Sequence, residues 1–455
     1  MPALTLQPEL TYLGGELRPD LSLIIDGGRI RSVGSTQEGE VIRLPRRVVV
    51  PGLVSAHSHA FQRLLRGATE WRAEGHDDFW AWRERMYSVA SRISPDGLED
   101  VCAFTFLEML RAGITTVGEF HYLHRDSQGK PYANPNELAL RVVAAAERVG
   151  IRITLLNCAY ARGGAGRALA GPQLRFDLGS IVRFLSDTEE LERQARDRPL
   201  VTVGIAPHSV RALDREQLQE LARGSAQRGW PIHMHLAEQP AEVEACLAET
   251  GLRPVELAAE VGLLSSRFCA VHAIHVAANE IELLGQAGAA ICACPTTERA
   301  LGDGIVPADA FRRAGARLAL GTDSNTQIDL LEEARSLELN LRLLRRERIL
   351  VDAARNDRGR LARTLFEAAT SGGRMALGLS PAAIEPDGLA DLVSFDLDDP
   401  SLAGREEDLL PRLVFGGQTR AVSDVMVNGR FVIRDRGHPE QKKIAERFGR
   451  IAAEV

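Results

Sequence analysis

The chain has 455 residues, of which 45% are hydrophobic and 26% are charged, a composition typical of a globular protein with a large core. Lys and Arg together number 55 and Asp and Glu 62, so the formal net charge is −7, and the sequence has no basic stripe for nucleic acid. The N-terminal segment has neither the basic nor the apolar region of a signal peptide, and no apolar run reaches the length of a membrane span. We therefore expect a cytoplasmic protein whose partners include neither nucleic acid nor membrane.

The two ends of the chain are both predicted to form short strands joined by turns. Within residues 1–47 the turn signal is Asp26-Gly27-Gly28 between apolar runs, and near the other end it is Asn428-Gly429. We predict that residues 1–47 and 385–440 form one small β-sandwich domain. A helical tail is expected over 441–455.

Between residues 48 and 384, apolar strand-like runs alternate with segments of helical periodicity. The segments 95–113 and 214–229, for example, have apolar residues at i, i+3 and i+4 and end at Gly. The strand-like runs cover 47–56, 115–120, 152–157, 200–207, 231–238, 269–275, 289–294 and 317–324. Eight such repeats predict an α/β fold, a parallel (β/α)8 TIM-like barrel, in which the chemistry lies at the C-terminal ends of the strands.

Two long connections interrupt the repeat, one after the first predicted strand (60–95) and one after the third (158–176). Both lie on the face of the barrel where active-site loops belong. The first contains Trp71, Trp80 and Trp82. We interpret these connections as lids or substrate-binding loops.

Six cysteines in a chain of this length do not make a disulfide framework, which agrees with a reducing compartment. Cys292 and Cys294 lie in the apolar run AAICAC. Because free cysteine is commonly buried, we predict that both lie in the core.

Most of the eleven histidines fall at the ends of predicted strands, which scattered core histidines would not do. In the sequence H-x-H at the end of the first strand, the period of two directs His57 and His59 to the same side. His235 lies on the fifth predicted strand and Asp323 ends the eighth. Three imidazoles and a carboxylate with room for a water have the composition of a catalytic zinc site.

The order H-x-H, H, H and D on predicted strands 1, 5, 6 and 8, opened by PGLVSAHSH, resembles the amidohydrolase superfamily of metal-dependent hydrolases and deaminases. The resemblance spans nearly the whole chain and implies a distorted (β/α)8 barrel with a β-sandwich from both chain ends. It implies four metal ligands: His57, His59, His235 and Asp323. It further implies that His272 lies near the catalytic water, that Asp323 takes the proton of that water, and that Glu238 acts as the proton shuttle.

The metal is expected to be a single divalent ion, because the run 200–207 contains no lysine that could be carbamylated to bridge two metals. Imidazole and carboxylate ligands suit Zn²⁺, which we expect, and also Fe²⁺. The superfamily resemblance also implies a homodimer.

Four stretches, HSHAFQR, DDFWAWRERMY, APHSVRA and HMHLAEQ, together resemble the formimidoylglutamate deiminases of histidine degradation within this superfamily. That resemblance implies hydrolysis of N-formimino-L-glutamate, a small-molecule dicarboxylate, to N-formyl-L-glutamate and ammonia. Hydroxide generated at the metal would attack the formimino carbon. A substrate with two carboxylates and a cationic formamidine requires donors at one end of its pocket and carboxylates at the other. The donors implied for the two carboxylates are Gln62, Arg83, Tyr122, His208 and Arg211, with His121 as the alternative to Tyr122.

Two other functions stay open at this point. The first is another single-metal deaminase of the superfamily that acts on an aminopurine nucleoside or a cyclic amidine. The second, from a different class, is a barrel without catalytic activity that serves as a scaffold; the presence of the four candidate ligands together with His272 and Glu238 disfavours it.

Overall fold

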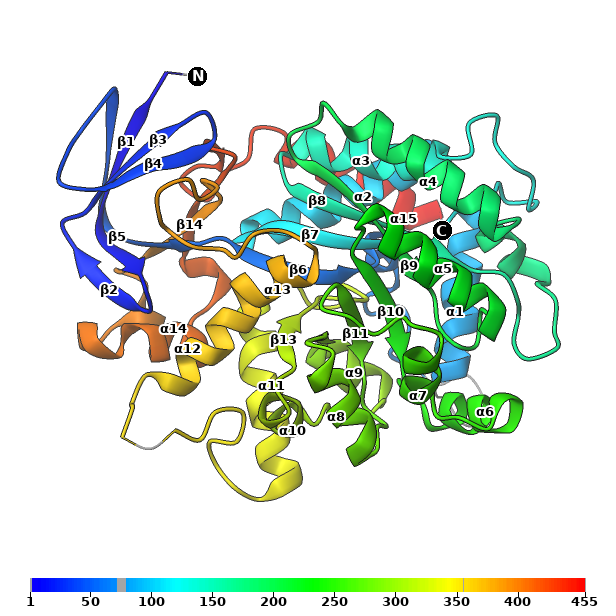
Figure 1. Ribbon diagram of the computed structural model, residues 1–455. Helices are drawn as coiled ribbons and strands as arrows, with labels where there is room; N and C mark the ends of the chain where they lie inside the picture. Colours follow the sequence, from blue (N-terminus) through cyan, green and yellow to red (C-terminus); the bar gives the residue numbers. More distant parts are fainter. Residues whose placement is uncertain (1, 72–78, 355, 455) are drawn as a thin grey trace.

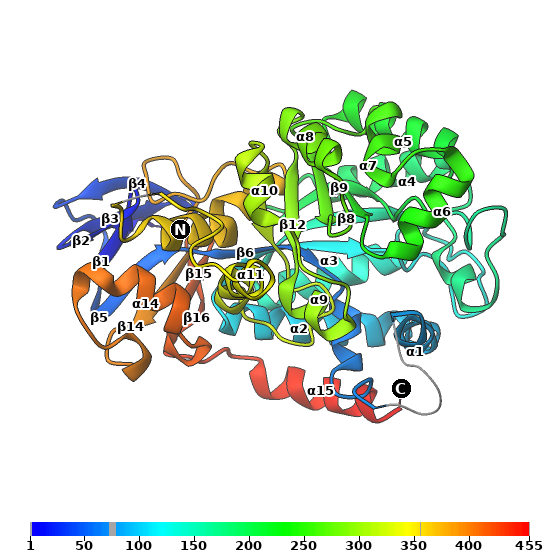
Figure 2. The same ribbon diagram turned by 90° about the horizontal axis from the view of Figure 1, so that it is seen from below.

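The structure is a computed structural model that describes residues 2–71, 79–354 and 356–454. Eight parallel strands form a nearly closed barrel, and strands from both ends of the chain form a mixed sheet beside it (Figure 1). Figure 2 shows the same two parts from below, with the N-terminal and C-terminal strands gathered at one end of the molecule. The predicted fold class, an α/β barrel with a β domain built from both termini, is confirmed.

Neighbouring barrel strands are parallel and follow one another in chain order around the sheet. They are β6 (Leu53–Ser58), β7 (Ile114–His121), β8 (Arg152–Ala159), β9 (Val201–Pro207), β10 (Ile232–Leu236), β11 (Phe268–His272), β12 (Ala290–Ala293) and β13 (Arg317–Leu320). Their side chains are almost entirely buried, because helices cover the outside of the barrel and the inward side chains fill its interior.

The barrel closes through the residues that follow its first and last strands. Ser58 and Asp323 form an isolated parallel bridge between the end of β6 and the segment after β13. The N–H of His59 donates to Asp323 O at 2.9 Å, and the N–H of Asp323 donates to His57 O at 3.0 Å. The closing bridge therefore brings two of the predicted metal-binding histidines against the predicted aspartate.

Helices follow the strands around the outside of the barrel. In this part of the chain they are α1 (Phe79–Arg92), α2 (Pro95–Arg111), α3 (Glu137–Val149), α4 (Ile181–Ala195), α5 (Arg215–Arg228), α6 (Pro240–Thr250), α7 (Pro254–Glu260), α8 (Ala278–Gln286), α9 (Pro295–Leu301), α10 (Ala308–Arg313), α11 (Leu330–Arg345), α12 (Arg360–Glu367) and α13 (Gly373–Ala376). Their ends follow local sequence signals: α5 begins with a capping box between Asp214 and Gln217 and ends at Gly229, which has a φ of 70°.

Several predicted strands extend too far at their C-terminal ends. The predicted run 231–238 ends as a strand at Leu236, 269–275 ends at His272, and 317–324 ends at Leu320. At two of these ends the backbone turns into a left-handed conformation: His272, the last residue of β11, has a φ of 68°, and Ala237, the first residue after β10, has a φ of 50°. Asp323, in the segment after β13, has a φ of 44°. His275 therefore lies outside the strand that was predicted to contain it.

The predicted first barrel strand, 47–56, spans two elements. Its first residues belong to β5 (Glu40–Pro51) of the mixed sheet, and the barrel begins only at Leu53. Gly52 separates the two strands, and a Cβ at this position would come within 2.4 Å of the Thr115 methyl carbon. The apolar run is continuous in sequence because both strands are buried.

The mixed sheet contains eight strands in one hydrogen-bonded order, β16-β15-β14-β5-β1-β3-β4, with β2 paired to β1. Besides β5, these are β1 (Leu4–Leu13), β2 (Glu16–Pro19), β3 (Ser22–Asp26), β4 (Arg29–Gly34), β14 (Leu392–Asp396), β15 (Val422–Val427) and β16 (Arg430–Ile433). The strands predicted as a β-sandwich are thus connected as one sheet, in which β1 and β5 are parallel and the other pairs antiparallel.

Both predicted hairpin turns are present, and they lie against each other. Gly27 and Gly28 have φ values of 55° and 82°, and Asn428 and Gly429 have 51° and 74°, as a type I′ turn requires. A Cβ at Gly28 would come within 2.4 Å of Asn428 Oδ1. Two turns separated by about 400 residues in sequence thus form a single contact.

Two further contacts hold the sheet and the C-terminal segment to the barrel. Asp391, next to β14, accepts hydrogen bonds from Arg152 at the start of β8. The helix α15 (Gln441–Glu454), in the predicted helical tail, packs on α2 (Figure 2). The rings of Phe448 and Phe104 stack there with their centres 3.9 Å apart. The remaining helix of this part is α14 (Leu409–Gly416). Among the described residues, no helix is long and apolar enough to cross a membrane.

Candidate metal centre and substrate pocket

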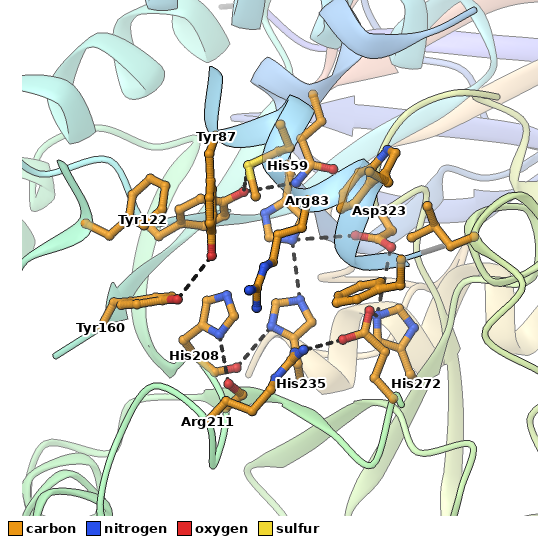
Figure 3. Close-up of a pocket in the computed structure, with 18 of the residues that line it drawn as sticks. His59, Arg83, Tyr87, Tyr122, Tyr160, His208, Arg211, His235, His272 and Asp323 are labelled. Atoms are coloured by element: carbon orange, nitrogen blue, oxygen red, sulfur yellow. Dashed lines mark hydrogen bonds and ion pairs between the residues drawn. The ribbon is translucent and has the colours of Figure 1, made fainter. Parts of the chain in front are cut away.

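Four of the predicted site residues converge where the barrel strands end. The side chains of His57, His59, His235 and Asp323 are buried, and their potential ligand atoms lie within 4.8 Å of one another. His57 Nε2 lies 3.2 Å from Asp323 Oδ1 and 3.2 Å from His235 Nε2. His59 Nε2 lies 3.5 Å from Asp323 Oδ1 and 3.4 Å from His235 Nε2. Three imidazole nitrogens and a carboxylate oxygen thus point to one space, and Figure 3 shows His59, His235 and Asp323 around it.

The hydrogen bonds of these side chains suit metal binding. His59 Nδ1 donates to Phe120 O at 3.0 Å, and His235 Nδ1 donates to His208 O at 3.0 Å. Each bond leaves the Nε2 lone pair free to bind a cation. Burial lowers the pKa of His57 to about 3 and also lowers those of His59 and His235, which keeps the imidazoles neutral.

Asp323 supplies the negative charge of the cluster. Burial alone would raise its pKa, but the hydrogen bond with His57 and the nearby charge of His272 hold the pKa below its usual value. An ionised carboxylate beside three neutral imidazoles fits a divalent ion such as Zn²⁺ or Fe²⁺. These residues therefore form a metal-binding site.

His272 lies beside this cluster and contacts three carboxylates. Its Nδ1 is 3.3 Å from Glu298 Oε1, and its Nε2 is 3.7 Å from Glu238 Oε1 and 3.9 Å from Asp323 Oδ2. Burial by itself lowers the pKa of His272, but the hydrogen bond to Glu298 and the charges of Glu238 and Asp323 raise it to about 10. The imidazole is thus fixed in orientation by Glu298 and faces the metal-binding residues.

A pocket of about 680 Å³, including the open space at its mouth, lies above the metal-binding residues. All five residues predicted to bind substrate line it: Gln62, Arg83, Tyr122, His208 and Arg211. Glu238, His272 and Asp323 line the same pocket, so the structure brings the predicted catalytic and substrate-binding residues together. In Figure 3 the Arg83 side chain extends into the space bordered by His208 and His235.

The two arginines of the pocket differ in their partners. Arg211 Nη2 donates to Glu238 Oε2 at 2.9 Å, and its Nε lies 3.4 Å from Glu242 Oε2. Arg83 lies over the rings of Trp80 and Tyr87, and among the described residues it forms no ion pair with a carboxylate. Arg83 Nε is buried without a hydrogen-bond partner. The pocket therefore contains a positive charge that the described part of the protein does not neutralise.

The two long connections supply much of the pocket wall. From the first, α1 contributes Phe79, Trp82, Met86 and Tyr87, and from the second come Tyr160, Gly163 and Phe176. Residues 72–78 of the predicted lid, including the start of the DDFW motif, lie outside the described residues. The second half of the first connection, 60–95, is thus largely the helix α1.

Other histidines and cysteines lie away from the pocket. His121 is buried behind it, and the neighbouring Tyr122 lines it, with its hydroxyl accepting from Gln62 Nε2 at 2.9 Å. His233 and His275 bind the backbone oxygens of Ala376 and Asp303. Cys292 and Cys294 are free and fully buried, as predicted.

Sequence reasoning missed four polar residues around the site. Tyr87 and Tyr160 line the pocket, with their hydroxyls 3.4 Å apart, while Glu242 and Glu298 support Arg211 and His272. A weak signal existed for Glu242, which follows Glu238 by four residues. Glu298 lies on α9, which no motif connected to His272.

The chain resembles several known proteins over nearly its full length. A model of the amidohydrolase family matches residues 48–432. Formimidoylglutamate deiminase of Pseudomonas aeruginosa is 39% identical over 409 residues, which cover 90% of this chain and 89% of that protein. A 5-methylthioadenosine/S-adenosylhomocysteine deaminase of Natronomonas pharaonis is 30% identical over 435 residues, which cover 95% and 91%. The crystal structure of an amidohydrolase from Brucella melitensis has a TM-score of 0.92 at 35% identity, covering 99% of both chains.

Proposed function

Because the chain belongs to the amidohydrolase family of metal-dependent hydrolases, we propose that it is a deiminase that converts N-formimino-L-glutamate and water to N-formyl-L-glutamate and ammonia. The 39% identity to a formimidoylglutamate deiminase supports this choice among the reactions of the family. The proposal makes the substrate a small dicarboxylate with a cationic formamidine group.

The observation that carries the proposal is the distribution of charge in the pocket. Arg83 and Arg211 line it together with Glu238 and Asp323, and in the described part of the chain no carboxylate pairs with Arg83. A substrate carboxylate would supply the missing partner, since guanidinium groups bind carboxylates through paired hydrogen bonds. Gln62 and Tyr122 line the same pocket and would add neutral donors.

The four metal-binding residues, His57, His59, His235 and Asp323, would hold the catalytic ion. When bound, a divalent ion such as Zn²⁺ lowers the pKa of water from 15.7 to about 7, which makes a strong nucleophile available at neutral pH.

The proton transfers belong to residues around His272. In the proposed reaction Asp323 takes a proton from the attacking water, and His272 orients that water by a hydrogen bond. Glu238, whose Oε1 lies 3.7 Å from His272 Nε2, gives a proton to the departing nitrogen. The C–N bond to that nitrogen then breaks, ammonia leaves, and the water oxygen remains on the carbon as the formyl oxygen.

The proposal is tested by incubating the zinc-loaded protein with N-formimino-L-glutamate, N-formimino-L-alanine, adenosine and 5-methylthioadenosine, and by measuring ammonia. We expect release from N-formimino-L-glutamate, with equal amounts of N-formyl-L-glutamate and no formamide. Removal of the metal by a chelator should abolish the activity, and added Zn²⁺ should restore it. Ammonia from an aminopurine nucleoside alone would instead assign the protein to the purine-related deaminases, and formamide would show that the other C–N bond breaks.

A further inference from the structure

Glu242 is a fully buried carboxylate that contacts Arg211 and does not itself line the pocket above the metal-binding residues. It is the third residue of α6, and it borders a second cavity that shares the wall formed by Arg83 and Arg211. Burying a carboxylate is unfavourable unless it is paired and hydrogen-bonded. The contacts of Glu242 must therefore compensate for the cost of its burial.

Each oxygen of Glu242 meets a different part of the site. Oε1 accepts a hydrogen bond from the N–H of Ala237 at 2.8 Å, and Oε2 lies 3.4 Å from Arg211 Nε. Arg211 in turn donates from Nη2 to Glu238 Oε2 at 2.9 Å. One carboxylate thus contacts both the backbone that leads into Glu238 and the arginine that pairs with Glu238.

Helix capping does not account for these contacts. In α7 and α8 the third residues, Glu256 and Glu280, reach back to the N–H of their own N-cap residues. Glu242 occupies the equivalent position in α6, but its Oε1 binds Ala237, two residues before the N-cap Gln239. The side chain is directed at the site instead of at its own helix.

The backbone that Glu242 holds is a strained one. Ala237 has a φ of 50°, a conformation that is unfavourable for a residue with a Cβ and persists only where other contacts enforce it. The hydrogen bond from its N–H to Glu242 is one such contact, and it sets the direction in which Glu238 leaves the strand.

Arg211, which Glu242 contacts, has one N–H donor group without a partner. Arg211 Nη1 is buried without a hydrogen-bond partner, while Nε and Nη2 face the two glutamates. Phe79 and Trp80 lie against the guanidinium group, with their ring centres 5.5 and 5.9 Å from Cζ. The guanidinium is thus oriented by the protein with one donor left for a ligand in the pocket.

We propose that Glu242 is a positioning residue that fixes Arg211 and Glu238 relative to each other, so that the group that binds a substrate carboxylate and the group that carries the proton stay in register. This inference rests on the proposed deiminase function. Burial raises the pKa of Glu242 to about 7, and the charge of Arg211 opposes that rise.

The first test compares Glu242→Gln with the wild type on N-formimino-L-glutamate. The amide oxygen can still accept from Ala237, but the charge opposite Arg211 is lost. We expect KM to rise about tenfold and kcat to change less than about threefold, because an Arg211 that has lost its ion pair with Glu242 would lose about one charge-assisted hydrogen bond to the substrate carboxylate, worth roughly a factor of ten. Binding of the product N-formyl-L-glutamate, measured by calorimetry, should weaken by the same factor. Glu244→Gln, an exposed position on the same helix, is the matched control and should leave all three values unchanged.

The second test uses the Arg211→Met background, in which Glu242 keeps only its hydrogen bond with Ala237, which the amide of Gln can also accept. There, Glu242→Gln should produce no further rise in KM, and it should raise the melting temperature, because it removes a buried carboxylate that has lost its partner. This reversal of sign separates positioning through Arg211 from a general structural role, which would lower the melting temperature in both backgrounds.

The outcomes distinguish the two proposals. A wild type that releases no ammonia from N-formimino-L-glutamate would overturn the deiminase function and this inference with it. An active wild type with an unchanged KM in Glu242→Gln, or independent losses in the double variant, would overturn the role of Glu242 alone.

Discussion

Several residues of the site lie where the backbone leaves the strands in a left-handed conformation. His272, the last residue of β11, and Asp323, in the segment after β13, both have positive φ values, and Asn325 nearby has a φ of 55°. Asn325 binds Asp323 O and Ser58 Oγ through its side chain, so this turn is held by hydrogen bonds across the closing point of the barrel. Such strain is commonly concentrated at functional sites, where it fixes the direction of a side chain.

The proposed role of Glu238 as the proton donor can be tested with a single substitution. We expect Glu238→Gln to lower kcat about 10²- to 10⁴-fold, because the amide cannot protonate the departing nitrogen. Metal content, measured by elemental analysis, should equal that of the wild type, since Glu238 is not among the four clustered ligands. A kcat within tenfold of the wild-type value would contradict the assignment.

Among the elements, α1 shows how a helix can serve a pocket instead of the core. The residues it presents to the pocket, Phe79, Trp82, Arg83, Met86 and Tyr87, follow the i, i+3, i+4, i+7, i+8 spacing of one helix face. A pattern that usually indicates packing against a core here places an arginine among aromatic rings. The helix therefore forms one wall of the pocket, and in the proposed function its arginine would bind the substrate.

The helix can be tested through Arg83. We expect Arg83→Met to lower kcat/KM for N-formimino-L-glutamate at least 100-fold, because a charge-assisted hydrogen bond to a carboxylate contributes about 1.5–3 kcal/mol and the guanidinium offers two. Steady-state ammonia release measures the effect. Arg92→Met, on the same helix but outside the pocket, should stay within twofold of the wild type. An Arg83→Met variant with nearly normal kcat/KM would contradict a dicarboxylate substrate.

For the whole molecule, a buried ionic cluster joins the barrel to the mixed sheet. Asp391 accepts from Arg152 Nε at 2.7 Å and from Arg374 Nη1 at 3.2 Å, and it also accepts from the N–H of Asn428 at 2.7 Å. These partners come from β8, from α13 and from the turn before β16. A charge buried among so many partners connects elements that are far apart in sequence.

Burial by itself would raise the pKa of Asp391, but Arg152, Asn428 and Arg374 hold it below its usual value. A lowered pKa in the folded state means that this group stabilises the fold above the unfolded pKa of about 3.9 and loses that contribution as the pH falls further. We expect Asp391→Asn to lower the free energy of unfolding by about 3–5 kcal/mol at pH 7, since it leaves two guanidinium groups unpaired.

Urea unfolding between pH 3 and 7 measures this effect, and the difference from the wild type should shrink toward pH 3. Asp398→Asn, which removes an exposed partner of Arg46, is the control and should change the free energy by less than about 1 kcal/mol. Equal losses in the two variants would contradict a special role for the buried cluster.

The sequence alone determined what depends on short-range pattern. The apolar runs predicted the eight barrel strands, the Gly and Asn-Gly pairs predicted two hairpins, and H-x-H predicted that His57 and His59 act together. These features follow from the periods of strands and helices and from the φ values that glycine and asparagine allow. The first barrel strand was misplaced because two buried strands in succession produce one unbroken apolar run.

Only the tertiary structure decided which distant side chains meet. Glu242 contacts Arg211 across 31 positions of the sequence, and Glu298 contacts His272 across 26. No repeating sequence pattern predicts either contact. Likewise Asp323 was predicted to end a strand, whereas the structure places it after the strand in a left-handed turn, where it faces His57. Such contacts depend on barrel closure and on the angles at which strands end, which no local pattern encodes.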